Sequence, residues 1–357
     1  MENASHKIDY HIFRFSKADL DDFFPEPCFK EVINTDAFRR LGSIHFLGAI
    51  DYLMLGGQKG VERRHTRYDH SLAVANLARR FTLAKDLPRK ECETIIVSAL
   101  LHDIGHAPLS HSLEPAFRNI FEIDHHKVGE RILRGEVPIG LRLARSLERN
   151  RINNIEVMAI IAGFGDGAGK DLFSRSINVD TVEGIIRSAS YLHRREVLLN
   201  PVYVMDALAS LGKSSHDILD HFWMMKDHVY DKIIQSRVGL MADYLCKRYM
   251  EINSSSFSST YYYGTEAELR RDHHNLFAAL DIFGRDGLIS PDIVGDGEEI
   301  RFTKRMFYID SSVTLKSYAD LDRRYLQKKR GVISKIKKTG GDDAHGAKEY
   351  PEGPKLF

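Results

Sequence analysis

Cysteine is scarce in this sequence, and the three cysteines, Cys28, Cys92 and Cys246, lie far apart. They form no CxxC pair, which excludes a cysteine-rich zinc module and argues against a disulfide framework. The pattern predicts a protein of the reducing cytoplasm. Long hydrophobic runs are also missing: the first twenty residues lack the apolar core of a signal peptide, and the longest apolar stretch, near residues 157–163, is too short to span a bilayer. We therefore expect no membrane partner.

An excess of charge of one sign is equally absent, because 51 Lys and Arg residues face 50 Asp and Glu residues. This balance gives no indication of nucleic acid or of an anionic membrane as a partner, so any recognition of an anion has to be local. What the chain does have is length and apolar content. Its 357 residues are 43% hydrophobic, which is enough for a large core with a smaller appendage.

Most of the sequence predicts helix, because apolar residues recur at spacings of three and four. We expect a mainly α fold with a small α+β C-terminal appendage. The predicted divisions are an N-terminal arm (1–29), a helical core (30–252), a C-terminal α+β subdomain (253–327) and a mobile tail (328–357). The subdomain would begin with a Ser-rich connector and contain a strand pair around Ile300–Phe302 and Met306–Ile309.

Histidine is crowded into one part of the chain, where an apolar helix pattern ends in His102-Asp103-Ile104-Gly105-His106 and His70 lies about thirty residues upstream. Imidazole nitrogen and carboxylate oxygen are both good donors to divalent metals. Gly105 and the following Pro108 end the helix, so the His-Asp pair should lie beside a loop where the two side chains can converge. The spacing predicts a metal site. It does not choose among Mn²⁺, Fe²⁺, Mg²⁺, Co²⁺, Ni²⁺ and Zn²⁺.

The ordered motifs carry a family resemblance: Arg67-Tyr68-Asp69-His70, then residues 100–111 (LLHDIGHAPLSH), then Glu114, then Asp124-His125. This combination resembles the HD-domain phosphohydrolase superfamily and, more narrowly, its deoxynucleoside triphosphate triphosphohydrolase branch, which includes bacterial dGTPases and vertebrate sterile-alpha-motif HD-domain enzymes. The resemblance implies a helical HD core in which one divalent metal ion is bound by His70, His102, Asp103 and a later Asp. We take Asp206 as that later ligand, with Asp180 and Ser188 as alternatives; serine is a poor ligand for these metals.

The resemblance also implies roles for other residues. Members of the branch hydrolyse a dNTP to a deoxynucleoside and tripolyphosphate, with water attacking the α-phosphorus. His106 would be the general acid and Glu114 would orient the water or His106. Arg67, His111 and His125 would bind the phosphates. The expected partner is a nucleotide, and family members commonly form homo-oligomers. Two alternatives remain: an HD phosphohydrolase acting on a nucleoside monophosphate or a phosphodiester, and a nucleotide-binding or sensing protein without turnover.

Overall fold

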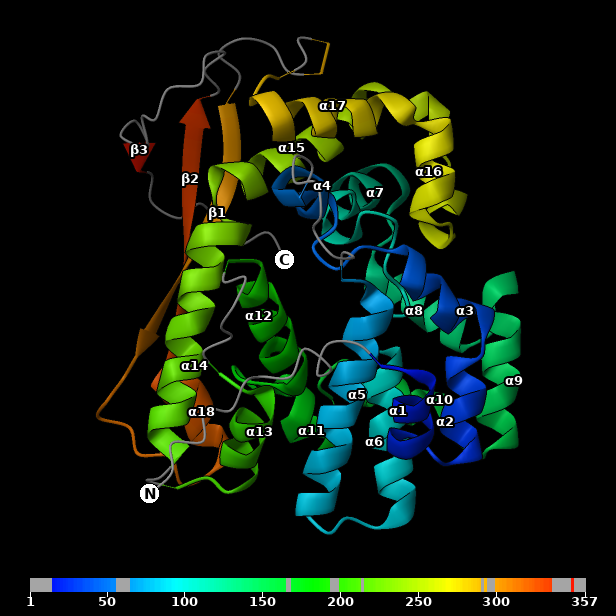
Figure 1. Cartoon of the computed structure of the whole chain (residues 1–357), viewed down its shortest axis with the longest axis vertical. Coiled ribbons are helices and arrows are strands. Elements are labelled where there is room, and N and C mark those ends of the chain that lie inside the picture. Colours follow the sequence, from blue (N-terminus) through cyan, green and yellow to red (C-terminus); the bar gives the residue numbers. More distant parts are fainter. Residues whose placement is uncertain are drawn as a thin grey trace.

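The structure, a computed structural model, describes residues 15–55, 65–164, 168–192, 199–212, 215–289, 292–293, 299–335 and 348–349. Helices dominate, and one narrow β-sheet flanks them on one side (Figure 1). The predicted mainly α class with a small β element is therefore confirmed. No helix in the described part of the chain is both long and apolar enough to cross a membrane. Arg63 and Arg64, which precede the predicted metal site, lie outside the described residues.

The helices of the N-terminal and central parts are α1 (Lys17–Phe23), α2 (Pro27–Ile33), α3 (Asp36–Arg40), α4 (Ala49–Leu55), α5 (Arg67–Ala84), α6 (Arg89–Leu101), α7 (Glu114–Phe121), α8 (His125–Leu133), α9 (Leu141–Arg149), α10 (Asn154–Ile161), α11 (Ala168–Ser174), α12 (Val179–Leu192), α13 (Pro201–Ala209), α14 (His216–Val229) and α15 (Arg237–Ile252). The predicted N-terminal arm is not separate from the core. Phe24, Cys28 and Phe29 are buried in the same apolar cluster as the central helices.

Helices α5 and α6 pack along each other and carry the two halves of the predicted metal site. Thr66 caps the N-terminus of α5 and forms a capping box with Asp69, which fixes where that helix begins. Helix α6 ends at Leu101 with His102 as its C-cap, as the Gly and Pro signals predicted. Gly105 is required here because a Cβ at this position would lie 1.9 Å from the His125 carbonyl oxygen. The loop after α6 therefore touches the start of α8.

The C-terminal part differs from the prediction in three places. The Ser-rich connector expected over residues 253–260 lies in a segment with two 3-10 turns, η7 (Ser254–Ser256) and η8 (Ser259–Tyr263), and this segment buries Phe257 and Tyr262. Helix α16 (Glu266–Asp272) packs against α17 (His274–Asp286), and α17 packs on α4 and α15, so this segment completes the main core instead of starting a subdomain. A polar Ser-rich sequence can still be ordered when a few aromatic side chains anchor it.

The third difference concerns the strands. The two predicted short strands are one strand, β1 (Glu299–Ile309), which pairs antiparallel with β2 (Tyr325–Lys335) after helix α18 (Tyr318–Arg324). Residues 328–335 therefore belong to a strand and not to a mobile tail. Beyond them the structure describes only β3 (Lys348–Glu349), paired with β2, and the rest of the predicted tail lies outside the described residues. Trp223 of α14 packs against Phe307 and Tyr325 and attaches the ribbon to the helices.

Candidate metal centre

Four side chains from helices α5 and α12 and from the C-terminal end of α6 bring their donor atoms together. Asp180 Oδ1 of α12 lies 3.1 Å from His70 Nε2 and 3.6 Å from His102 Nε2, and the two Nε2 atoms are 3.2 Å apart. The Asp103 carboxylate lies 3.5 Å from each Nε2 atom. The predicted meeting of His70, His102 and Asp103 is therefore present in the structure.

The spacing of these atoms fits a bound divalent ion. Donors at about 2.1 Å from a metal are about 3.0 Å apart in octahedral and about 3.4 Å apart in tetrahedral coordination. The observed separations of 3.1 to 3.6 Å fall at or close to this range. Two buried imidazole Nε2 atoms facing each other at 3.2 Å repel unless a proton or a cation lies between them. The separations between the four side chains are thus consistent with a divalent-metal site.

Both histidines are held in the orientation that a metal ligand needs. Nδ1 of His70 is bonded to the Glu183 carboxylate, and Nδ1 of His102 lies 2.8 Å from the Ala99 carbonyl oxygen. A ligand histidine whose other ring nitrogen is hydrogen-bonded is fixed in tautomer and direction. Arg187 in turn donates to Glu183 at 2.9 Å. The two Nε2 atoms are therefore left to face the common centre.

The electrostatics of the centre favour a cation. Burial opposes protonation of His102, but Asp103 and Asp180 outweigh burial and raise the pKa of His102 to about 9. A proton and a metal ion compete for the same lone pair, so an environment that attracts one attracts the other. The side chains of His70, His102 and Asp103 are at most 8% exposed, whereas the Asp180 side chain is 46% exposed. The centre therefore opens to solvent on the side of Asp180.

The preferred fourth ligand, Asp206, is not at the centre. Asp206 is exposed on α13 and is not among the described His, Cys, Asp and Glu residues whose donor atoms cluster. The hydroxyl of the alternative, Ser188, donates to the Gly184 carbonyl oxygen of its own helix at 2.7 Å. Asp180, two turns before Ser188 on α12, lies beside His70 and His102 instead. The structure does not bring Asp206 to the other three residues: α13 also packs on α5, but Asp206 lies on its exposed side.

A second cluster adjoins the first through Asp103, whose Oδ1 lies 3.1 Å from His106 Nε2. Donor atoms of His106, His111, Glu114 and His125 lie within 4.8 Å of one another. The rings of His106 and His125 stack at 4.6 Å, and His106 Nδ1 is buried without a hydrogen-bond partner among the described residues. Burial and the nearby Arg67 guanidinium lower the pKa of His106 to about 3, so His106 is neutral in the free protein.

The contacts of this cluster change two expected roles. Glu114 bonds His125 Nδ1 at 2.5 Å and Arg118 at 2.9 Å, so it orients His125 and not His106. Arg67 donates to Asp103 at 2.7 Å and to Ser110 at 3.1 Å and is almost fully buried. Its guanidinium therefore holds a metal ligand in place. A direct contact of Arg67 with phosphate is not what this geometry favours.

The loop between the clusters is braced from the C-terminal segment. Leu109 and Ser110 both have positive φ, and the Leu109 N–H donates to the buried Glu266 carboxylate at 3.2 Å. Glu266 also accepts from the His45 N–H at 2.8 Å and from the Tyr52 hydroxyl at 2.6 Å. Sequence reasoning missed Glu266, as it missed Glu183. Neither lies in a motif, because a residue that supports a site from a distant segment leaves no local pattern.

Lys226 is a further residue whose contacts the sequence did not give. It lies on α14, donates to the Ser176 carbonyl oxygen at 3.2 Å and is close enough to Asp180 for the carboxylate to favour its charged form. Burial lowers the pKa of Lys226 to about 8, so the ammonium remains largely protonated at neutral pH. A cation thus lies next to the open side of the metal centre.

Comparison with known proteins agrees with this site. Residues 67–211 match the family model of the HD domain. An uncharacterized protein of Mycoplasma genitalium is 25% identical over 57% of this chain and 51% of its own length. The deoxynucleoside triphosphate triphosphohydrolase SAMHD1 of Bos taurus is 34% identical over 26% of this chain and 16% of its own length. Residues 67–211 of the chain therefore form an HD domain, and the relatives matched here include a deoxynucleoside triphosphate triphosphohydrolase.

A solved structure extends the likeness in fold beyond the HD domain. A hypothetical protein from Aquifex aeolicus superimposes with a TM-score of 0.60 over 86% of this chain and 92% of its own, at 18% sequence identity. The curated relatives are longer than the matched region, and the chain spans about half their length or less. The matched HD region contains all four residues of the metal centre and all four of the adjoining cluster.

Proposed function

We propose that this chain is a metal-dependent hydrolase that cleaves deoxynucleoside triphosphates to deoxynucleoside and tripolyphosphate. The observation that carries the proposal is the contact of two clusters through Asp103: four metal-binding side chains on one side, and three histidines with a glutamate on the other. A site for metal binding alone has no need of the second cluster. Acid-base groups beside a metal centre are the arrangement that phosphate ester hydrolysis requires.

Asp180 replaces Asp206 in the proposed ligand set, which is His70, His102, Asp103 and Asp180. A divalent ion held there supplies charge stabilisation to the phosphate oxygens and makes water more acidic. Glu183 and the Ala99 carbonyl keep the two imidazoles in their ligating tautomers. Arg67 holds Asp103 in position and offsets part of the negative charge of the carboxylates.

His125 is the residue best placed to give a proton to the departing 5′ oxygen. Glu114 holds His125 Nδ1, which leaves Nε2 as the nitrogen that can face the substrate. His106 keeps a role beside it as a neutral imidazole that can accept a hydrogen bond from the reacting water. His111 is exposed on the rim of this cluster, where a phosphate group of the substrate can reach it. Lys226 provides a further positive charge near Asp180.

The similarity to a relative that carries the name deoxynucleoside triphosphate triphosphohydrolase supports the choice of substrate class. The experiment is incubation of the purified protein with each dNTP and NTP in the presence of Mn²⁺ or Mg²⁺, followed by chromatography. We expect deoxynucleoside and tripolyphosphate. Orthophosphate release from a monophosphate, or cleavage of a diester alone, would identify the alternative phosphohydrolase instead. Binding without any product would identify a nucleotide-sensing protein.

Two remaining expectations belong to the same proposal. A homo-oligomer is expected from the resemblance, and light scattering of the purified protein measures its mass in solution. A cytoplasmic location is expected from the three dispersed free cysteines. Neither expectation affects the chemistry of the site.

A further inference from the structure

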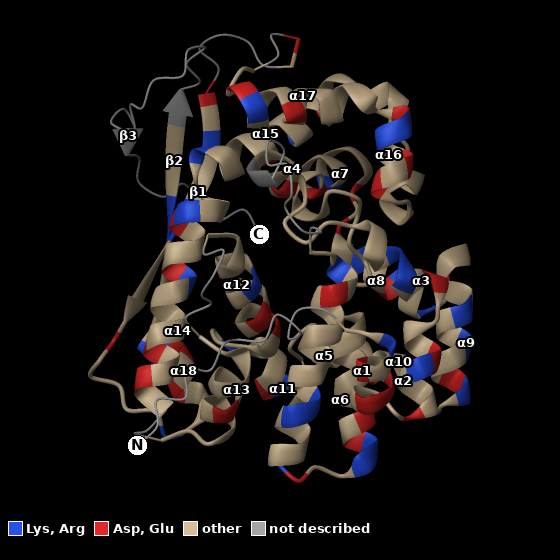
Figure 2. Cartoon of the chain, in the orientation of Figure 1, with Lys and Arg blue, Asp and Glu red and all other residues tan. Residues whose placement is uncertain are grey.

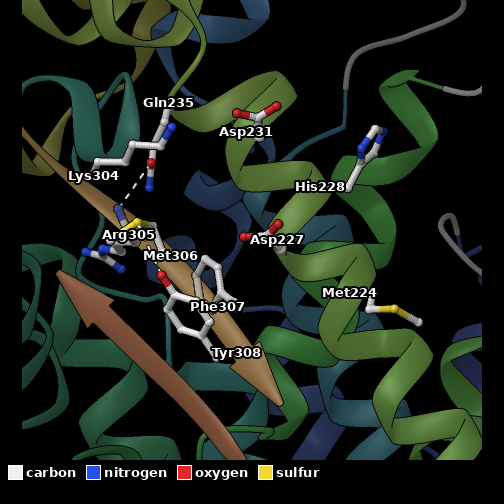
Figure 3. A pocket seen from close by; sticks show the side chains of 10 residues that line it. All are labelled: Met224, Asp227, His228, Asp231, Gln235, Lys304, Arg305, Met306, Phe307 and Tyr308. Carbon is white, nitrogen blue, oxygen red and sulfur yellow. Dashed lines mark hydrogen bonds between the residues drawn. The ribbon is translucent and has the colours of Figure 1, made fainter. Parts of the chain in front are cut away.

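Strand β1 is an edge strand in the described part of the chain. It pairs with β2 along its length, and no described strand lies on its other side. Edge strands expose unpaired N–H and C=O groups, which proteins commonly cover or shorten. This edge is eleven residues long, and it borders a cavity of about 500 Å³ between β1 and α14 (Figure 3).

The lining residues show that the cavity follows the edge of the strand and not one of its faces. Five consecutive residues of β1, 304–308, line it. Successive side chains of a strand point to opposite faces. Phe307 packs on Trp223 of α14, so its neighbours Met306 and Tyr308 belong to the other face. A cavity that touches both sets lies along the edge.

Backbone groups of β1 point into this cavity. The Arg305 N–H donates to Gln235 Oε1 at 3.1 Å, a bond that Figure 3 shows as a dashed line. This N–H therefore points away from β2. Because the direction alternates along an antiparallel strand, the N–H and C=O groups of Phe307 point the same way. The cavity thus offers main-chain donors and acceptors to a ligand.

The two walls of the cavity carry opposite charges. Lys304 and Arg305 line the strand side, and Asp227 and Asp231 line the helix side. Figure 2 shows the Lys and Arg positions of β1 in blue and the Asp positions of the helix in red. No ion pair among these described residues joins the walls, and Asp231 pairs with Lys232 at 2.8 Å instead. Each wall therefore presents a charge that a ligand can meet.

The walls are nevertheless close to each other. The hydrogen bond from Lys232 lowers the pKa of Asp231, and the charge of Lys304 across the cavity lowers it further. The helix wall is also irregular, because α14 continues into η6 (Tyr230–Ile234), a single π-helical turn that Gln235 follows directly. Such turns are rare and occur frequently at functional sites.

We propose that the cavity between β1 and α14 binds an extended peptide segment of a partner protein, which adds to the edge of β1 as an antiparallel strand. In strand addition, backbone hydrogen bonds give affinity and side-chain contacts give specificity. Charge complementarity assigns a basic residue of the peptide to Asp227 and an acidic residue to Lys304. A polyanion would meet the carboxylates of the helix wall, and a polycation would meet the cations of the strand wall.

The proposal does not depend on the hydrolase reaction, because none of the residues that line the cavity belongs to the metal centre or to the adjoining cluster. A failure to bind peptide would leave the proposed reaction untouched. Equally, an inactive protein could still bind the peptide.

The test uses the full chain and the peptide Val-Lys-Val-Thr-Glu, acetylated at its N-terminus and labelled with fluorescein at its C-terminus, with binding followed by anisotropy. In the proposed register the peptide Lys lies opposite Phe307 and the peptide Glu opposite Lys304. The amide N–H groups of the peptide Lys and Thr then point toward β1, and those of the second Val and of Glu point away.

N-methylation of the peptide amides distinguishes the two edges of the peptide. Methylation at Lys and Thr should weaken binding by at least about tenfold, because two interface hydrogen bonds are lost. Methylation at the second Val and at Glu, which leaves the same side chains and the same number of methyl groups, should change the affinity by less than about twofold.

Charge reversal on each wall tests the register. K304E should weaken binding by about three- to tenfold, and a peptide with Lys in place of its Glu should restore it. D227K should act in the same way, with restoration by a peptide that has Glu in place of its Lys. The matched controls are R301E on the same strand and D217K on the same helix, both at exposed residues outside the cavity. Circular dichroism confirms that each variant is folded.

The proposal is overturned if the wild-type chain does not bind the peptide at millimolar concentration, if both methylated peptides lose the same affinity, or if the controls lose as much affinity as K304E and D227K. Two other occupants would also overturn it. Equal competition by free lysine and glutamate would identify a small zwitterion as the ligand. Self-association of the chain that K304E abolishes would identify a second copy of the chain.

Discussion

Replacing Asp180 tests the ligand assignment that the structure changed. Asp180→Ala removes a carboxylate whose Oδ1 lies 3.1 and 3.6 Å from the two Nε2 atoms, and leaves three ligands. Loss of a residue that only supports a ligand already costs about 10- to 100-fold in metal affinity. Loss of a charged ligand itself should cost at least about 100-fold, or roughly 2.7 kcal/mol. Asp206→Ala should have no effect, because Asp206 is exposed on α13.

The assay is calorimetric titration of the metal-free protein with Mn²⁺, with the bound metal counted by mass spectrometry. Glu183→Gln serves as an intermediate case. It leaves all four ligands and weakens only the support of His70, so the loss should lie between about 10- and 100-fold. A protein that keeps its metal after Asp180→Ala and loses it after Asp206→Ala would refute the geometric reasoning and restore the original assignment.

Three further predictions follow from the contacts at the site. The pKa of His102 is raised to about 9 in the metal-free protein, so metal must displace a proton. The apparent affinity for Mn²⁺ should therefore rise about tenfold per pH unit from pH 7 to 9 in calorimetric titrations. An affinity that does not change with pH would contradict this prediction. Glu114→Gln should lower kcat by about 10²- to 10⁴-fold with an unchanged metal content, since Glu114 bonds His125 and Arg118 and no residue of the metal centre. Equal loss of bound metal would place Glu114 among the ligands. Glu266→Ala leaves the amides of His45 and Leu109 without an acceptor. It should lower the free energy of unfolding, measured by urea titration, by about 2–5 kcal/mol. The control Glu268→Ala, at the exposed capping box of the same helix, should lower it by only about 1 kcal/mol.

The local part of the site was predictable from the sequence. His102, Asp103, His106 and Gly105 lie in one run, and the end of an apolar helix pattern showed where that run would leave the helix. His70 follows a capping signal, Thr66 with Asp69, that fixed the start of α5. Short-range signals of this kind determine local conformation directly. Glu114 and His125 were expected at the site from the family resemblance and not from such local signals.

The long-range part was not predictable in the same way. Asp180 and Asp206 both lie in helical patterns, and α12 and α13 both pack on α5, so only the direction in which each helix presents its carboxylate decides which one reaches His70. Glu266 reaches Leu109 across 157 positions of sequence. Such contacts depend on tertiary packing, for which periodicity carries no information.

The extent of the C-terminal strands was not predicted correctly, for a related reason. Residues 328–335 are rich in Lys, and their polarity resembles that of a solvated tail. Pairing with β1 supplies backbone hydrogen bonds along the whole segment, from Tyr325 opposite Ile309 to Lys335 opposite Glu299. Amino-acid composition describes the side chains of a segment and does not show whether another strand pairs with it. A strand rich in charged residues is therefore easily mistaken for a solvated tail.

Anomalous diffraction from crystals of the Mn²⁺-loaded protein tests the central claim most directly. The account predicts a peak within about 2.3 Å of Nε2 of His70 and His102 and of the carboxylates of Asp103 and Asp180. A peak between His111, Glu114 and His125, with none at His70 and His102, would contradict it.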